Sequence, residues 1–186
     1  MKLRIHNFIE TTSVNGPGNR FGLWVQGCNL NCPSCFNQKT HSFNSGSLRQ
    51  IEEIFQMIIS VKGIEGVSIS GGEPFLQSKA LLDLVTLIKK ETNFSILIFS
   101  GFNLDELKND KTSNKILKLT DILIAGRYDE NCKINNPLLS SSNQKIHFIS
   151  NRYSINDLHS SDTEIIINKQ GNLILSGVGV KFEYVS

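Results

Sequence analysis

Short apolar runs alternate with longer amphipathic segments through most of this chain. Short runs bounded by glycine or polar residues are typical of buried strands, whereas the longer segments repeat their apolar residues at helical spacing. This alternation predicts right-handed βαβ units and a parallel sheet. Because a closed barrel needs eight strands, we predict an α/β fold with an open, partial parallel β/α barrel. The predicted strands of this sheet are residues 21–26, 67–70, 95–99, 122–125 and 145–150.

Amphipathic periodicity marks the predicted helices. Ser47 and Gln50 have the S-x-x-Q form of a capping box, which predicts a helix from there to about residue 60. A second helix is expected over residues 79–90, and a polar helix in two pieces over residues 104–118. The apolar faces of the first two helices would be formed by Leu48, Ile51, Ile54, Phe55 and Ile58, and by Leu81, Leu84, Val85 and Ile88.

The character of the chain changes after residue 150. Residues 163–168 and 172–176 are rich in Ile and Leu and flank Lys169-Gln170-Gly171, which predicts a β-hairpin. We therefore divide the 186 residues into a main domain, 1–150, and a C-terminal extension, 151–186. The hairpin could cover the open edge of the sheet or contact a partner, and we favour the first role.

Composition argues against several classes of protein. The formal net charge is +2 and 39% of the residues are hydrophobic, which is typical of a globular domain and gives no reason to expect nucleic acid as a partner. No apolar run approaches the roughly 18 residues of a membrane span. The first residues also lack the apolar core of a signal peptide. We expect a cytoplasmic protein that does not bind membranes.

Three of the four cysteines stand close together as C-x3-C-x2-C, at Cys28, Cys32 and Cys35. Without a secretion signal this spacing favours metal binding over disulfides. Zinc and most iron–sulfur clusters take four protein ligands, so three thiolates leave one metal position open. We expect Cys132 to be a free thiol, with a fourth ligand as the alternative. The histidines have no metal-ligand spacing and are expected to be surface or packing residues: His6, His41, His147 and His159.

A second motif, Gly71-Gly72-Glu73-Pro74, follows the next predicted strand. Alone it is a turn before a helix, but two glycines also allow positive φ and a close backbone approach to a ligand. The Glu73 carboxylate could accept a hydrogen bond from an ammonium group. Ser100 follows the third strand. Because the carboxyl ends of parallel strands meet at one rim, we expect Ser100 and both motifs to lie there together.

The two motifs, in this order, resemble the radical SAM (S-adenosylmethionine) superfamily. The resemblance implies that the three cysteines hold three irons of a [4Fe–4S] cluster and that the fourth iron takes the amino and carboxylate groups of SAM. It also implies a set of SAM-binding residues. They are Ser34 and Phe36 beside the adenine and Gly71, Gly72 and Glu73 at the methionine end. Ser100 is added to them as a SAM contact because it follows a strand at the same rim.

Other segments resemble one branch of that superfamily, the activating proteins of anaerobic (class III) ribonucleoside-triphosphate reductases. They are residues 14–20, 37–40, 98–107, 121–128 and 141–144. This resemblance implies reductive cleavage of SAM to methionine and a 5′-deoxyadenosyl radical, which removes hydrogen from a backbone glycine of the large reductase subunit. The cluster would need a low potential, so a flavodoxin or ferredoxin is implied as the electron donor.

This chain differs from that branch at one position, and two alternative functions stay open. Proteins of that branch often end the fourth strand with Asp-Gly, whereas this chain has Ala125-Gly126, which leaves Arg127 or Asp129 to replace any role of that acid. The motifs do not fix the substrate, so a radical SAM enzyme of similar shape could modify another protein, a peptide or a small molecule. A non-catalytic adaptor that binds zinc or a cluster is the third hypothesis.

Overall fold

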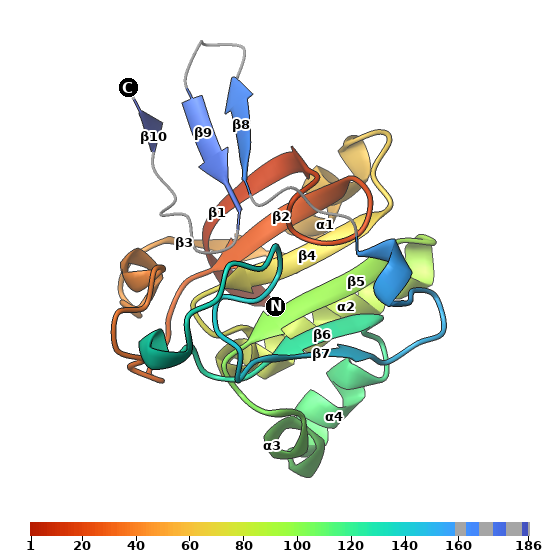
Figure 1. Cartoon of the computed structure of the whole chain (residues 1–186). Coiled ribbons are helices and arrows are strands. Elements are labelled where there is room, and N and C mark those ends of the chain that lie inside the picture. Colours follow the sequence, from red (N-terminus) through yellow and green to blue (C-terminus); the bar gives the residue numbers. More distant parts are fainter. Residues whose placement is uncertain (159–162, 168–172, 178–183, 186) are drawn as a thin grey trace.

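The computed structural model describes residues 1–158, 163–167, 173–177 and 184–185 (Figure 1). Its main body is one seven-stranded sheet in the order β3-β1-β2-β4-β5-β6-β7. His159 and the predicted Lys169-Gln170-Gly171 turn lie outside the described residues. The strands are β1 (Lys2–Thr12), β2 (Arg20–Val25), β3 (Ser47–Gln50), β4 (Gly66–Gly71), β5 (Ser95–Ser100), β6 (Ile122–Ala125) and β7 (Lys145–Phe148).

The centre of this sheet is parallel, as the alternation predicts. β2, β4, β5 and β6 pair in parallel in that order, and every residue of β2 and β6 is buried. Strands that are covered on both faces consist of continuous apolar runs, so their positions could be predicted from the sequence. The mixed α/β class and the parallel-rich sheet are therefore confirmed.

The prediction that residues 145–150 continue the parallel alternation is wrong. β7 pairs antiparallel with β6, with Ile122 opposite Phe148 and Ala125 opposite Lys145. A parallel strand needs a long crossover, usually through a helix. The connection from β6 to β7 contains only the short 3-10 helix η3 (Glu130–Cys132), so the chain turns back along its neighbour. On the other side of the sheet, β1 pairs antiparallel with both β2 and β3.

The helices pack against one face of the sheet. They are α1 (Ile51–Ser60), α2 (Ser78–Glu91), α3 (Leu104–Asn109) and α4 (Lys111–Leu117), and Figure 1 shows α1 and α2 behind the central strands. Their buried residues form the main core with alternate strand residues such as Ile96 and Ile98. The intervening Leu97 faces the opposite side, where Leu138 from the β6–β7 connection covers it. The two-piece helix predicted over 104–118 is confirmed.

The first helix starts later than predicted. Residues 47–50 form β3 and pair with residues 2–5 of β1, so Leu48 lies on an edge strand and is 53% exposed. The helix begins at Ile51, and the backbone N–H of Gln50 donates to the Glu53 carboxylate at 3.3 Å. The capping box therefore exists three residues downstream of the predicted one. Sequence periodicity could not reveal this, because pairing with β1 decides the conformation of residues 47–50.

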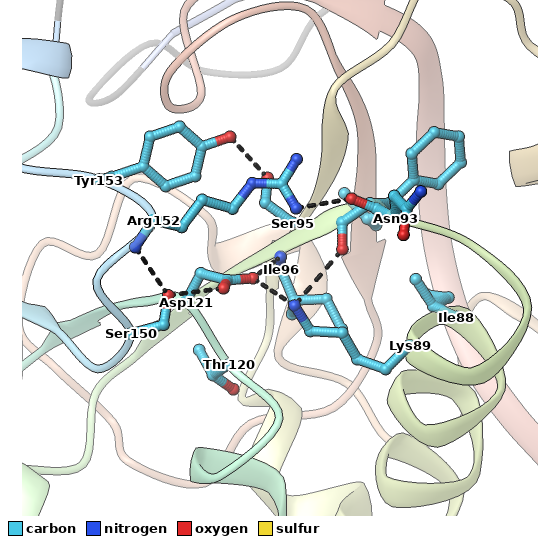
Figure 2. A network of polar contacts seen from close by, with 12 residues as sticks. Ile88, Lys89, Asn93, Ser95, Ile96, Thr120, Asp121, Ser150, Arg152 and Tyr153 are labelled. Carbon is cyan, nitrogen blue, oxygen red and sulfur yellow. Dashed lines mark hydrogen bonds and ion pairs between the residues drawn. The ribbon is translucent and has the colours of Figure 1, made fainter.

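A polar network closes the end of the sheet where the parallel strands begin (Figure 2). Asp121, just before β6, accepts hydrogen bonds from Lys89 Nζ at 2.6 Å, the Ile96 N–H at 2.8 Å and Ser150 Oγ at 2.7 Å. Burial alone would raise the pKa of Asp121, but these donors outweigh burial and lower the pKa. Tyr153 extends the network by donating to Ser95 Oγ at 3.0 Å.

Arg20 supports the same end of the sheet from inside. Its guanidinium is fully buried and donates to Ser68 Oγ at 2.7 Å, Ser95 Oγ at 2.9 Å and the Val67 carbonyl at 3.0 Å. Burial lowers the pKa of Arg20, because a charged group loses its hydration there. The polar groups of this end are thus engaged in holding strands together, which leaves the opposite end for binding.

The predicted C-terminal hairpin is present. β8 (Glu164–Ile167) and β9 (Leu173–Ser176) pair antiparallel, and β10 (Tyr184–Val185) pairs with the other edge of β9. The favoured role of covering an edge of the sheet is not what the described strands do, because β8, β9 and β10 form a separate sheet and do not pair with the edge strands β3 and β7. Figure 1 shows β8 and β9, in blue, beside β1 and β2. No helix in the described part of the chain has the length and apolar character needed to cross a membrane.

Candidate active site

The cysteine loop leaves the carboxyl end of β2 and closes on itself. The Gly27 N–H donates to the Thr40 carbonyl at 2.7 Å, and the Cys28 N–H donates to the His41 carbonyl at 3.0 Å. Within the loop, Asn31 (φ 51°) and Ser34 (φ 54°) adopt the left-handed conformation that few non-glycine residues take. Such strained positions persist only where surrounding contacts enforce them, and they gather at functional sites. All four cysteines are free and half-buried.

The G-G-E-P turn is locked against the start of the cysteine loop. The Gly72 N–H donates to the Val25 carbonyl at 2.8 Å and the Glu73 N–H to the Gly27 carbonyl at 2.9 Å. A Cβ on Gly72 would lie 2.4 Å from the Gly27 carbonyl oxygen, and one on Gly71 would lie 2.5 Å from that of Val25. The glycines are therefore required by the neighbouring backbone. They fix the two motifs relative to each other.

Glu73 is buried and joins the turn to the end of β5. Its Oε1 accepts from the Phe75 N–H at 3.0 Å and from Ser100 Oγ at 2.9 Å, and its Oε2 accepts from the Gly101 N–H at 2.7 Å. Burial raises the pKa of Glu73 to about 7, although these donors act in the opposite direction. The carboxylate is thus a brace between two segments of the rim, the turn and the end of β5, as well as a part of the pocket wall.

One pocket at the carboxyl ends of the parallel strands collects nearly all of the predicted site residues. Phe36 stands at its wall, with Tyr128 edge-on at a ring-centroid distance of 6.0 Å. Ser34 belongs to the cysteine loop but is not among the residues that line the pocket. The predicted residues that do line it are Cys28, Cys32, Cys35, Phe36, Gly71, Gly72, Glu73 and Ser100.

Several lining residues were not predicted from the sequence. Tyr128 is the third residue after the end of β6, so the rule of strand carboxyl ends could have found it. His41, expected to be a surface or packing residue, also lines the pocket. Asn15 and residues 175–177 line it from segments that precede β2 and end β9, and no local signal marks them. They reach the pocket only because the fold brings these two distant segments together.

The two residues considered as replacements for the missing acid after β6 do not line this pocket. Arg127 forms a fork with Glu106, with both N···O distances 3.1 Å, and lies over the Phe102 ring. The Asp129 carboxylate accepts from the Asn131 N–H at 3.0 Å at the start of η3. Both side chains have structural partners of their own.

The donor set fits a cluster held by three cysteines. Burial raises the pKa of the Cys28 and Cys35 thiols, so both are protonated until a metal replaces the proton. In the described residues, no group of three or more His, Cys, Asp or Glu side chains is arranged to hold a single metal ion. A cluster has a different requirement, because each thiolate binds a different iron.

Comparison with known proteins gives the class of this site. Residues 14–147 match the family model of the 4Fe-4S single cluster domain. Two anaerobic ribonucleoside-triphosphate reductase-activating proteins are similar over nearly their whole length. That of Salmonella typhi is 30% identical over 79% of this chain and 99% of its own, and that of Haemophilus influenzae is 34% identical over 75% and 94%.

More distant relatives were also found. The pyruvate formate-lyase 1-activating enzyme of Escherichia coli (strain K12) is 29% identical over 76% of this chain and 58% of its own. Among solved structures, QueE from Escherichia coli matches with a TM-score of 0.46 and 21% identity over 54% of this chain and 53% of its own.

The family model and the activating proteins define a radical SAM protein that carries a single 4Fe–4S cluster. The chain belongs to the family of anaerobic ribonucleoside-triphosphate reductase-activating proteins. Its cofactors are accordingly a [4Fe–4S] cluster and SAM.

Proposed function

We propose that this protein is a glycyl-radical-activating enzyme whose target is the large subunit of an anaerobic ribonucleoside-triphosphate reductase. When bound and reduced, the cluster supplies one electron to SAM, which yields methionine and a 5′-deoxyadenosyl radical. That radical takes a hydrogen atom from a backbone glycine of the target and leaves a glycyl radical and 5′-deoxyadenosine. The observation that carries the proposal is the convergence of both motifs on one pocket, in a chain whose nearly full-length relatives carry that name.

The chain's own residues have distinct tasks in this proposal. Cys28, Cys32 and Cys35 bind the cluster as thiolates, and the half-buried loop limits the access of water to it. The Gly71–Gly72 turn holds the methionine end of SAM close to the cysteine loop. Phe36 lies on the adenine side, and Ser34 shapes the cysteine loop next to it without lining the pocket. Ser100 donates a hydrogen bond to Glu73, so the two residues together keep the turn and the end of β5 at a fixed distance.

Further features of the enzyme belong to the same proposal. The parallel-rich sheet is an open, partial β/α barrel of the radical SAM type, with residues 1–150 as its domain and residues 151–186 as an extension. A flavodoxin or ferredoxin donates the electron, and the protein acts in the cytoplasm. Cys132, whose Sγ lies 3.8 Å from an Asp129 carboxylate oxygen, is not a cluster ligand.

A second candidate is activation of a different glycyl radical enzyme. The similarity to the pyruvate formate-lyase 1-activating enzyme over 76% of this chain favours it over a small-molecule substrate. Both candidates share the same pocket and cofactors and differ only in the protein that enters. The adaptor hypothesis differs from both because it predicts no cleavage of SAM.

The test is anaerobic incubation of the reconstituted protein with SAM, a low-potential reductant and the large reductase subunit of the same organism. We expect the EPR doublet of a glycyl radical on that subunit, and none with Cys32→Ala. The Cys132→Ala variant is a matched control and should give the doublet. Absence of the doublet, while the same sample forms 5′-deoxyadenosine, would reject the reductase as target. A doublet on pyruvate formate-lyase alone would support the second candidate.

A further inference from the structure

The C-terminal hairpin is seated on the segment that precedes β2. Asn15 Nδ2 donates to Ser176 Oγ of β9 at 2.8 Å, and both side chains are buried. On β8, the Glu164 carboxylate accepts from the Ser13 N–H at 3.1 Å and from Ser13 Oγ at 3.0 Å. Both strands of the hairpin are therefore anchored on residues 13–15, which lead directly into β2 and the cysteine loop.

The anchored end of the hairpin is part of the pocket wall. Leu175, Ser176 and Gly177 line the same pocket as the three cysteines. They lie outside residues 14–147, the part of the chain that matches the family model. The extension therefore contributes a wall to a site whose other walls the family model includes. This part of the pocket wall lies beyond the region that the family model covers.

The hairpin also carries an apolar face that runs away from the pocket. Ile165 stands opposite Leu175, and Ile167 opposite Leu173. Residues opposite each other on paired strands point to the same face, so these four form one apolar face. Leu175 lines the pocket, while Ile165 and Ile167 are 66% and 68% exposed and Leu173 is 36% exposed. A strip of exposed Ile and Leu continuous with a binding pocket is typical of a contact surface.

The pocket and the exposed apolar strip are both largely uncharged. The lining contains no Lys, Arg or Asp among the described residues, and its carboxylate, that of Glu73, already accepts three hydrogen bonds. Ile165 and Ile167 stand two residues apart on one strand, a spacing of about 7 Å that matches alternate side chains of an extended chain. An extended, uncharged and largely apolar segment fits such a surface.

We propose that the face formed by Ile165, Ile167, Leu173 and Leu175 is the docking surface for the partner's extended, uncharged segment that carries the glycine to be oxidised. The inference rests on the proposed function and adds the place where the partner binds. The segment lies along the hairpin and enters the pocket past Leu175. The C-terminal extension thus binds the partner, while the cysteine loop binds the cluster and the G-G-E-P turn binds SAM.

The test compares two variants of the full-length reconstituted protein with the wild type. The double variant Ile165→Glu plus Ile167→Glu places two carboxylates on the proposed surface. The control is Ile155→Glu, because Ile155 is also 66% exposed but belongs to the short 3-10 helix η4 (Ile155–Asp157), outside the hairpin. Binding of the fluorescently labelled large reductase subunit is titrated by anisotropy in the presence of SAM, and glycyl radical is measured by EPR in the same samples.

We expect the dissociation constant of the double variant to rise at least about tenfold, and that of Ile155→Glu to stay within about twofold of the wild type. Circular dichroism should show that both variants are folded, because both changes are at exposed positions. Equal affinities of the double variant and the wild type, or no binding by the wild type, would overturn the docking proposal. Tight binding by the wild type without a glycyl radical would instead overturn the proposed function.

Discussion

Replacing Gly72 by alanine tests whether the two motifs are held together by direct backbone packing. The added Cβ would meet three backbone atoms of Gly27, its oxygen at 2.4 Å, its carbonyl carbon at 2.8 Å and its nitrogen at 3.0 Å. None of these is the end of a flexible side chain, so the G-G-E-P turn or the cysteine loop must move. Overpacking of this kind costs about 1–3 kcal/mol, and weakening the Glu73–Gly27 backbone hydrogen bond adds about 1 kcal/mol.

We therefore expect Gly72→Ala to lower the free energy of unfolding of the apoprotein by about 2–4 kcal/mol, measured in urea. The matched control is Gly63→Ala. Gly63 has a φ of +77° and nothing within 4 Å of its Cβ position, so only backbone strain of about 1–2 kcal/mol is expected there. Gly72→Ala should also hold less iron after reconstitution, because the cysteine loop is displaced. A loss of stability no larger than that of Gly63→Ala would refute the packing argument.

Three other variants test the cluster ligand Cys28, the Asp121 network and the buried Arg20. Cys28→Ala should abolish the absorbance of the reconstituted cluster, whereas Cys132→Ala should keep it; an intact cluster in Cys28→Ala would disprove the ligand assignment. Asp121→Asn should cost about 1.5–3 kcal/mol at neutral pH, because Lys89 loses a charged acceptor. The pKa of Asp121 is lowered in the folded state, so this contribution is complete above the unfolded pKa of about 3.9 and disappears as the pH falls through the folded value. Urea titrations of the wild type and Asp121→Asn should therefore converge in acid, and a constant difference down to pH 2 would contradict this. Arg20→Lys should cost about 2–4 kcal/mol in the same assay, because an ammonium cannot replace the planar fork that reaches Ser68, Ser95 and the Val67 carbonyl; a loss below about 1 kcal/mol would show that the network is dispensable.

The parallel centre of the fold was readable from the sequence because its strands are buried on both faces. The run at residues 122–125 coincides with β6, where every residue is buried. The direction of β7 was not readable, because it depends on the connection from β6 and not on residues 145–148 themselves. The conformation of residues 47–50 was missed for a similar reason. Leu48 fits a helical pattern, yet pairing with β1 decides the outcome.

The candidate site was predictable to the extent that its residues follow strand ends. Cys28, Gly72 and Ser100 stand at the ends of β2, β4 and β5, and parallel strands bring such positions to one rim. The roles found for Gly72 and Glu73 as braces could not be inferred, since they depend on atoms of Gly27 and Ser100 in other segments. The contribution of Ser176 was equally hidden, because its contact with Asn15 joins the two ends of the chain.

Reductive cleavage of SAM by this protein is measured by the production of 5′-deoxyadenosine. The protein is reconstituted anaerobically with iron and sulfide, reduced with dithionite and supplied with SAM, and the products are separated by chromatography. We expect 5′-deoxyadenosine and methionine in equal amounts, with none from Cys28→Ala, Cys32→Ala or Cys35→Ala. A wild-type protein that carries a reduced [4Fe–4S] cluster by EPR but forms no 5′-deoxyadenosine would contradict this expectation.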